Sequence, residues 1–96
     1  MRRAAKVDAN HKKIVASLRK VGYSVLNTHQ LKNAFDILVG HKGRNYAFEI
    51  KDGDKPPSAR KLTEGEQKFY DTWKGQIDVI YTAEQAIEII EGAKKN

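Results

Sequence analysis

The stretch that decides the fold reads FDILVGHKGRNYAFEIK and covers residues 35–51. Residues 35–40 and 45–51 are rich in β-branched and aromatic side chains, which are typical of strands. Between them, HKGR at 41–44 supplies a glycine that can adopt a positive φ angle. The pattern therefore predicts a β-hairpin.

Three charged residues interrupt the apolar strands of this hairpin, namely Asp36, Glu49 and Lys51. If the chain folds back between Lys42 and Gly43, Asp36 lies directly opposite Glu49. Side chains alternate along a strand and cross-strand partners share a face, so Lys51 joins the two carboxylates. A one-residue bulge in the turn would instead place Asp36 on the other face.

Two carboxylates directly opposite each other repel and destabilise a sheet, so we expect a cation between Asp36 and Glu49. Oxygen ligands and a substrate phosphate suit Mg²⁺ or Mn²⁺. The ammonium of Lys51 can then orient a water or stabilise charge developing on a phosphate. The alternative is an exposed sheet face on which Lys51 pairs with Glu49, but Leu38 and Ala47 share that face and favour partial burial.

The composition predicts one basic domain over residues 1–96, with one modest core. The chain carries 18 Lys and Arg against 12 Asp and Glu, a formal charge of +6, and no cysteine. Residues 1–62 hold 14 basic and 5 acidic side chains, whereas residues 63–96 hold 4 and 7. The balance favours an anionic partner, most simply nucleic acid. The lack of cysteine excludes disulfide scaffolds, zinc fingers and thiol nucleophiles.

Membrane association and export are not expected. No apolar run approaches the roughly 20 residues that a membrane helix needs. The start of the chain is basic, but no apolar segment follows it, so a signal peptide is not predicted. We expect a cytoplasmic protein without a membrane partner, in which residues 1–7 form a flexible basic arm.

The remaining chain predicts three helices and two short strands. The helices cover 8–21, 63–74 and a last segment from Thr82 onward, and the strands cover 23–27 and 77–81. The order α-β-β-β-α-β-α fits an α/β fold with a single mixed sheet flanked by helices. Residues 52–62, with two prolines and a glycine, form the least regular part.

The second helix has a capping signal at its start and two aromatic residues along one face. Thr63 and Glu66 have the spacing of a capping box. Phe69 and Trp73 are four residues apart on one helix face and are expected to belong to the core. A base-stacking role for Tyr23 or Trp73 would require exposure, which a sequence does not show.

The segments FDILVG at 35–40 and FEIK at 48–51 resemble the two halves of the PD-(D/E)XK nuclease motif. The chain from Asp8 to about Ile90 resembles small phage-type members close to the VRR-NUC and Holliday-junction-resolvase branches. The stretch KDGDKPPSARKLT at 51–63 is especially similar to those phage proteins.

The resemblance implies a restriction-endonuclease-like αβββαβ core plus a C-terminal helix. It also implies a Mg²⁺- or Mn²⁺-dependent endonuclease that hydrolyses DNA phosphodiester bonds in a structure-selective manner. In this family the motif Asp and Glu bind the metal, the residue between Glu and Lys lends its carbonyl, and the Lys assists the attacking water. Carried over, these are Asp36, Glu49, Ile50 and Lys51. Phe35 replaces the motif's proline, a residue that shapes the backbone and is not a ligand.

Relatives often add an acidic residue from the first helix, and here the available polar groups are Asp8, Asn10 and His11. Capping the helix is the alternative role for Asp8. His11 falls on the inward stripe, where packing or a substrate contact ranks ahead of metal ligation. Gln67, on the first turn of the second helix, is a further active-site candidate, with an exposed helix position as its alternative.

Lys55, Ser58, Arg60 and Lys61 follow the catalytic strand and are expected to bind DNA phosphates, the alternative being a solvated surface. Such contacts give affinity without sequence information. A two-fold homodimer would place two sites on opposite strands, as cleavage of a junction requires. The resemblance places such a protein in DNA repair or recombination, as a phage product acting in the bacterial cytoplasm.

Two other functions remain open from the sequence. The first is a catalytically silent nucleic-acid-binding module on the same fold. The second is a small structural subunit of a larger complex, whose acidic last helix, with Glu84, Glu88 and Glu91, would form the contact face.

Overall fold

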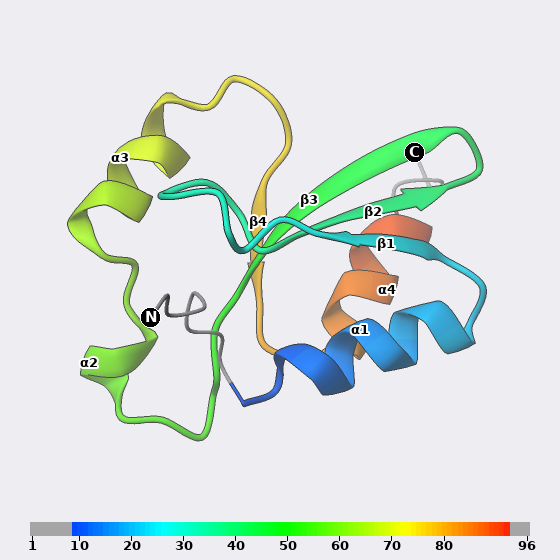
Figure 1. Ribbon diagram of the computed structural model, residues 1–96, viewed down its shortest axis with the longest axis horizontal. Helices are drawn as coiled ribbons and strands as arrows, with labels where there is room; N and C mark the ends of the chain where they lie inside the picture. Colours follow the sequence, from blue (N-terminus) through cyan, green and yellow to red (C-terminus); the bar gives the residue numbers. More distant parts are fainter. Residues whose placement is uncertain (1–8, 93–96) are drawn as a thin grey trace, which may run out of the picture.

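The computed structural model describes residues 9–92, and they form one mixed sheet with helices around it (Figure 1). The elements are α1 His11–Lys20, β1 Ser24–Asn27, β2 Ile37–His41, β3 Arg44–Ile50, α2 Pro57–Arg60, α3 Glu64–Thr72, β4 Asp78–Ile80 and α4 Ala83–Gly92. The strand order is β1-β2-β3-β4. The first three strands are antiparallel neighbours, and β4 runs parallel to β3. The predicted α/β fold with a single mixed sheet is confirmed. Asp8 and the arm at 1–7 lie outside the described residues.

The β2–β3 hairpin has the predicted register. The pairs run from Ile37 with Phe48 to His41 with Arg44. Only Lys42 and Gly43 connect the strands, and both have positive φ angles, 52° and 78°. Two consecutive residues of this kind make a type I′ turn, whose twist matches that of the strands. The turn therefore fixes which side chains of β3 face each side of the sheet.

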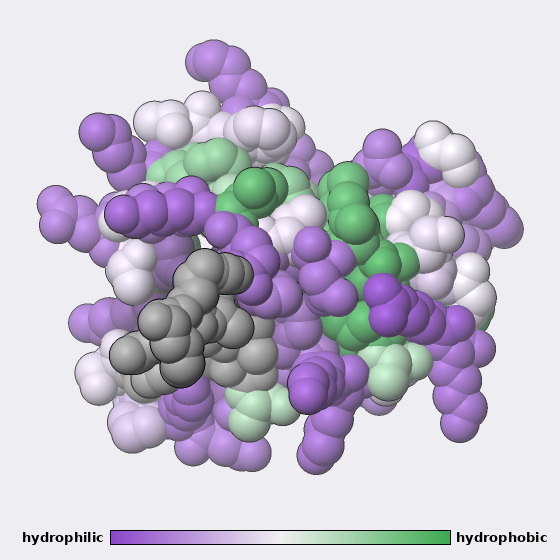
Figure 2. Space-filling model, in the orientation of Figure 1, coloured by the Kyte–Doolittle hydropathy of each residue, from purple (hydrophilic) through white to green (hydrophobic). Residues whose placement is uncertain are grey.

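The hydrophobic core lies between the sheet and the pair α1 and α4, which cover one face (Figure 1). Its largest fully buried side chains are Phe48, Leu18, Ile37, Ile80, Ile90 and Val39. Each such side chain stabilises the fold by about 1.5–3 kcal/mol relative to exposure. Figure 2 shows hydrophobic surface over the strands and a smaller area over α3, surrounded by hydrophilic side chains.

The end of α1 sets the direction of β1. Gly22 has a φ of 99°, a conformation that favours glycine after a helix. This turn lets the Tyr23 N–H donate to the Leu18 carbonyl at 3.1 Å, and the Gly22 N–H donate to Arg19 at 3.0 Å. The predicted helix stop at Gly22 is confirmed, and β1 begins two residues later. No helix within residues 9–92 is long and apolar enough to cross a membrane.

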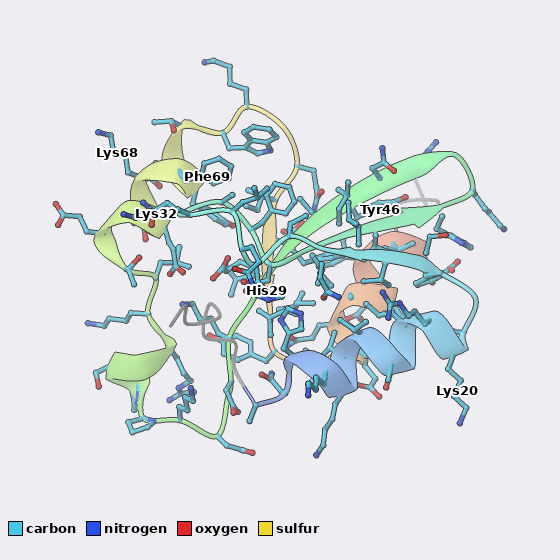
Figure 3. All side chains as sticks on the ribbon, in the orientation of Figure 1. Lys20, His29, Lys32, Tyr46, Lys68 and Phe69 are labelled. Carbon is cyan, nitrogen blue, oxygen red and sulfur yellow. The ribbon has the colours of Figure 1, made fainter. Side chains whose placement is uncertain are left out.

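The chain between β3 and α3 is irregular, as expected, except for one short helix, and one expectation for α3 was wrong. Residues 57–60 form the short helix α2, because Pro57 suits the first turn of a helix. Phe69 and Trp73 are not core residues: the Trp73 side chain is 44% exposed, and α3 ends at Thr72 because Trp73 is extended. Figure 3 shows Phe69 with α3, well apart from the core residue Tyr46. Within the described residues α3 does not pack closely on any other helix or strand, so this pair has no surface that buries it.

Candidate functional site

The end of β3 carries two buried charged side chains. Glu49 is 4% exposed and Lys51 is 8% exposed. The Lys51 Nζ lies 3.7 Å from the Glu49 Oε2. Burial of charge costs free energy unless the charges are paired and hydrogen-bonded. A strand that places charges here therefore departs from what stability alone would select.

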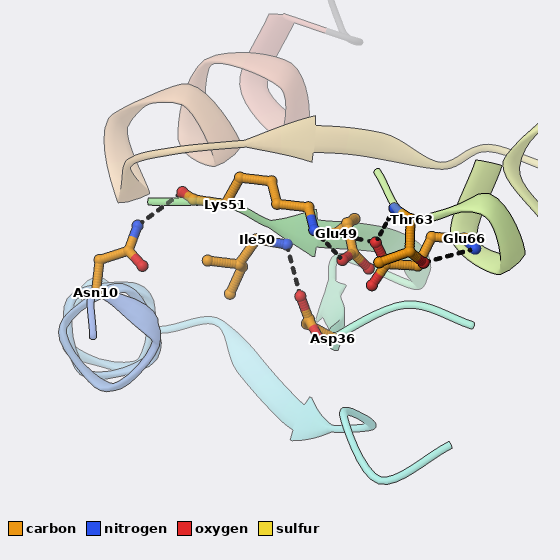
Figure 4. A network of polar contacts seen from close by, with 7 residues as sticks. All are labelled: Asn10, Asp36, Glu49, Ile50, Lys51, Thr63 and Glu66. Atoms are coloured by element: carbon orange, nitrogen blue, oxygen red, sulfur yellow. Dashed lines mark hydrogen bonds and ion pairs between the residues drawn. The ribbon is translucent and has the colours of Figure 1, made fainter. Parts of the chain in front are cut away.

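Asp36 contacts the end of β3 through both its side chain and its backbone. The Asp36 Oδ2 accepts a hydrogen bond from the Ile50 N–H at 2.8 Å (Figure 4). The paired part of β2 begins at Ile37, and the Asp36 N–H donates to the Phe48 carbonyl at 2.9 Å. The expected direct pairing of Asp36 with Glu49 is thus replaced by a bend just before β2. Both carboxylates still line one hollow of about 120 Å³.

A third carboxylate, Glu66 from α3, lines the same hollow. Its Oε1 accepts from the Thr63 N–H at 2.9 Å and from the Lys51 Nζ at 3.0 Å (Figure 4). The capping box predicted for Thr63 and Glu66 is confirmed. Its contact with Lys51 was not predicted, because no pattern in residues 52–62 indicates that they bring α3 back to the end of β3. The T-x-x-E spacing was the only available signal.

The three carboxylates differ in their affinity for a proton. Burial raises the pKa of Glu49 to about 9, and the nearby charges of Asp36 and Glu66 add to the shift. Burial also raises the pKa of Asp36, although the Ile50 N–H opposes this. Burial acts to raise the pKa of Glu66 too, but hydrogen bonds from Thr63 and Lys51 outweigh it and lower that pKa. Asp36 and Glu49 therefore share a site that disfavours two uncompensated negative charges.

The donor set fits a hard divalent cation. Asp36 and Glu49 offer carboxylate oxygens, the ligands that Mg²⁺ and Mn²⁺ prefer, and Mg²⁺ commonly binds one or two carboxylates and completes its shell with water or phosphate. Between residues 9 and 92, no three His, Cys, Asp or Glu side chains form a group that could hold a metal ion by themselves. A cation at Asp36 and Glu49 would therefore need the Ile50 carbonyl, water or substrate as further ligands.

Asn10 and His11 bind the start of α1 to neighbouring strands through hydrogen bonds. The Asn10 Nδ2 donates to the carbonyls of Lys51 and Tyr81, each at 2.9 Å. Asn10 occupies the N-cap position of α1 without capping it, and it lines a different cavity of about 270 Å³. His11 is 5% exposed, and its Nε2 lies 2.8 Å from the Asn27 Oδ1. The prediction that His11 faces inward is confirmed.

The remaining candidates lie outside the hollow. Gln67 is exposed, and its Nε2 donates to the Asp71 Oδ1 at 2.8 Å along α3. The phosphate-binding candidates all follow β3: Lys55, Ser58 and Lys61 are exposed, and Arg60 is half-buried. His29, which is not one of these candidates, does line the hollow.

Comparison with protein-family models, curated proteins and solved structures found no match for this chain. Kinship with the PD-(D/E)XK nucleases therefore stays a prediction from the residues.

Proposed function

We propose that this chain is a metal-dependent endonuclease that hydrolyses DNA phosphodiester bonds, a small PD-(D/E)XK protein close to the VRR-NUC and Holliday-junction-resolvase branches. One observation carries the proposal. Asp36 and Glu49, two carboxylates with raised pKa, line one hollow, and the Lys51 ammonium lies 3.7 Å from Glu49. Strongly perturbed groups gathered in a hollow are typical of catalytic sites.

Each residue of the site has a distinct role in the proposed reaction. Asp36 and Glu49 would hold Mg²⁺ or Mn²⁺, with the Ile50 carbonyl as a further ligand. When bound, such an ion polarises a phosphate oxygen and makes a water more acidic. Lys51 orients the attacking water and stabilises negative charge on the phosphate. Glu66 holds the Lys51 Nζ at 3.0 Å and so fixes where that ammonium points.

The basic segment after β3 would hold the DNA backbone. In the sequence, these residues lie between the end of β3 and the start of α3: Lys55, Ser58, Arg60 and Lys61. Phosphate contacts weaken steeply with salt. A homodimer would cut both strands of a junction, in keeping with a phage protein that acts on repair or recombination intermediates in the bacterial cytoplasm.

The test is cleavage of branched and linear DNA with Mg²⁺ or Mn²⁺. We expect Asp36→Asn and Glu49→Gln each to lower the rate by at least about 100-fold, the scale of removing a group that stabilises transition-state charge. The matched control is Glu64→Gln, which changes a carboxylate two residues before Glu66 on the exposed surface of α3. Absence of cleavage by the wild type, or cleavage that Asp36→Asn retains, would overturn the proposal.

A second candidate is a catalytically silent DNA-binding module on this fold. Phe35 at the proline position of the motif favours it. Under this alternative, DNA binding survives Glu49→Gln and does not depend on metal. Calorimetric titration with Mn²⁺ separates the two candidates, because the silent module binds no Mn²⁺.

A further inference from the structure

Three aromatic rings gather outside the core, at the side of the molecule where α3 lies. Phe69 and Trp73 stack with ring centroids 5.2 Å apart, and Phe35 lies 6.3 Å from Phe69 and 6.5 Å from Trp73. The Trp73 side chain is 44% exposed. We call Phe35, Phe69 and Trp73 the aromatic platform. Phe35 and Phe69 are half-buried, and an exposed aromatic ring packed beside them is typical of binding surfaces.

The aromatic platform adjoins the candidate metal site. Phe35 immediately precedes Asp36, and both residues line the hollow that also contains Glu49 and Glu66. Leu31, 58% exposed, lines the same hollow. A group stacked on the platform would therefore lie next to a phosphate held at Asp36 and Glu49.

The charges around the aromatic platform suit a nucleic acid. Lys32, Lys68 and Lys74 are exposed, and each stands within three residues of a platform ring in the sequence. Figure 3 shows Lys32 and Lys68 on the same side of the molecule as Phe69. The acidic Asp71 in this region accepts a hydrogen bond from Gln67. Aromatic rings interleaved with lysines allow bases to stack while phosphates are neutralised.

We propose that the aromatic platform stacks an unpaired nucleobase beside the scissile phosphate, so the preferred substrate is DNA with unpaired nucleotides at the cleavage point. This inference rests on the proposed nuclease function and names its substrate class. Bases inside a duplex are already stacked on both faces, whereas an unpaired base offers a free face. Tyr23, the other aromatic residue considered for stacking, is buried at 6% exposure and donates its hydroxyl to Glu91.

Trp73 is the single tryptophan of the chain, so its fluorescence reports on the platform directly. The protein is titrated in EDTA with a short oligothymidylate, with an abasic strand of the same length, and with a blunt-ended duplex of two separate, fully paired strands. Oligothymidylate is expected to quench Trp73, while the abasic strand and the duplex leave it nearly unchanged. Equal responses to oligothymidylate and the abasic strand would overturn the inference.

Substitutions measure the contribution of the ring. Trp73→Leu is expected to weaken oligothymidylate binding, followed by fluorescence anisotropy, by roughly 5- to 150-fold, with abasic-strand binding unchanged. Trp73→Phe keeps a stacking face and should retain most of the affinity. The matched control is Val21→Ala, which alters a 55% exposed apolar residue just after α1. Unaltered binding by Trp73→Leu would contradict the inference.

The metal-free titration separates this inference from the proposed function. Quenching without any cleavage in Mg²⁺ would support the platform and refute the nuclease. Cleavage without quenching would refute the platform and leave the nuclease standing. If Trp73 emission instead depends on protein concentration in the absence of DNA, and DNA does not alter it, the surface binds a second copy of the chain and the inference is wrong.

Discussion

The two faces of β3 differ in the chemistry of their buried side chains. Phe48 and Ile50 point toward α1 and α4 and are almost fully buried in an apolar core. Glu49 and Lys51 alternate with them and are also buried, yet their side chains are ionisable. One strand thus builds the stable core on one side and a costly polar site on the other. The first side therefore contributes stability, and the second is the side on which we propose that the chemistry takes place.

The largest expected loss of stability follows from a substitution on the core side of β3. Phe48→Ala should lower the free energy of unfolding by about 3–5 kcal/mol, because it removes a fully buried ring and leaves a cavity. Urea denaturation followed by circular dichroism measures this. A loss below about 1 kcal/mol would show that the core face is not the main source of stability.

The next effect on stability comes from the polar side of β3 and depends on pH. Folding raises the pKa of Glu49 from its ordinary 4.5 to about 9. The folded protein therefore binds more protons than the unfolded chain between these values. Its free energy of unfolding in EDTA should fall as pH rises from about 4.5 toward 9.

Glu49→Gln should flatten most of this decline, because an amide does not titrate. Glu64→Gln, an exposed change of the same kind, should leave the decline intact. The raised pKa of Asp36 acts in the same direction, whereas the lowered pKa of Glu66 matters only in more acidic solution. A free energy that is constant or rises over this range would contradict the description of the site.

A smaller loss of stability is expected at Asn10, which joins the start of α1 to the ends of two strands. Asn10→Ala leaves the carbonyls of Lys51 and Tyr81 without their shared donor. This should cost about 1–3 kcal/mol, the scale of an unsatisfied buried polar group. Gln67→Ala, on the exposed face of α3, should stay within about 0.5 kcal/mol. Equal costs for both variants in urea denaturation would show that Asn10 does not join α1 to the strand ends.

The smallest effect on stability is expected at Glu66. Glu66→Gln keeps an oxygen that can accept from the Thr63 N–H but removes the charge beside Lys51. The free energy of unfolding should change by less than about 1 kcal/mol, while cleavage falls by about 10- to 100-fold, as for other groups that orient a catalytic residue. A loss of cleavage that becomes larger at low pH would be a second sign that Lys51 is mispositioned. Unchanged cleavage would limit Glu66 to its capping role.

Much of this arrangement could be predicted from local patterns. The turn at Lys42 and Gly43 predicted the hairpin register, and side-chain alternation along the strand predicted that Glu49 and Lys51 share a face. The capping box located the start of α3. These features depend on residues close in the sequence, where backbone conformation and side-chain alternation decide the outcome.

Features that depend on long-range packing could not be predicted. The bend at Asp36 is set by a hydrogen bond from Ile50, fourteen residues away. The contact of Glu66 with Lys51 depends on the path of residues 52–62, which have no periodicity. Helical spacing suggested burial of Phe69 and Trp73, but spacing does not reveal whether a partner surface exists, and here the rings pack mainly with Phe35.

The central claim is that Asp36 and Glu49 form a site for a divalent cation. The most direct measurement is a crystal structure of the protein soaked in Mn²⁺, with anomalous diffraction data. We predict an anomalous peak within coordination distance of both carboxylates, and its loss in crystals of Asp36→Asn. An absent peak beside Asp36 and Glu49 at saturating Mn²⁺, or an equal peak in Asp36→Asn, would contradict the claim.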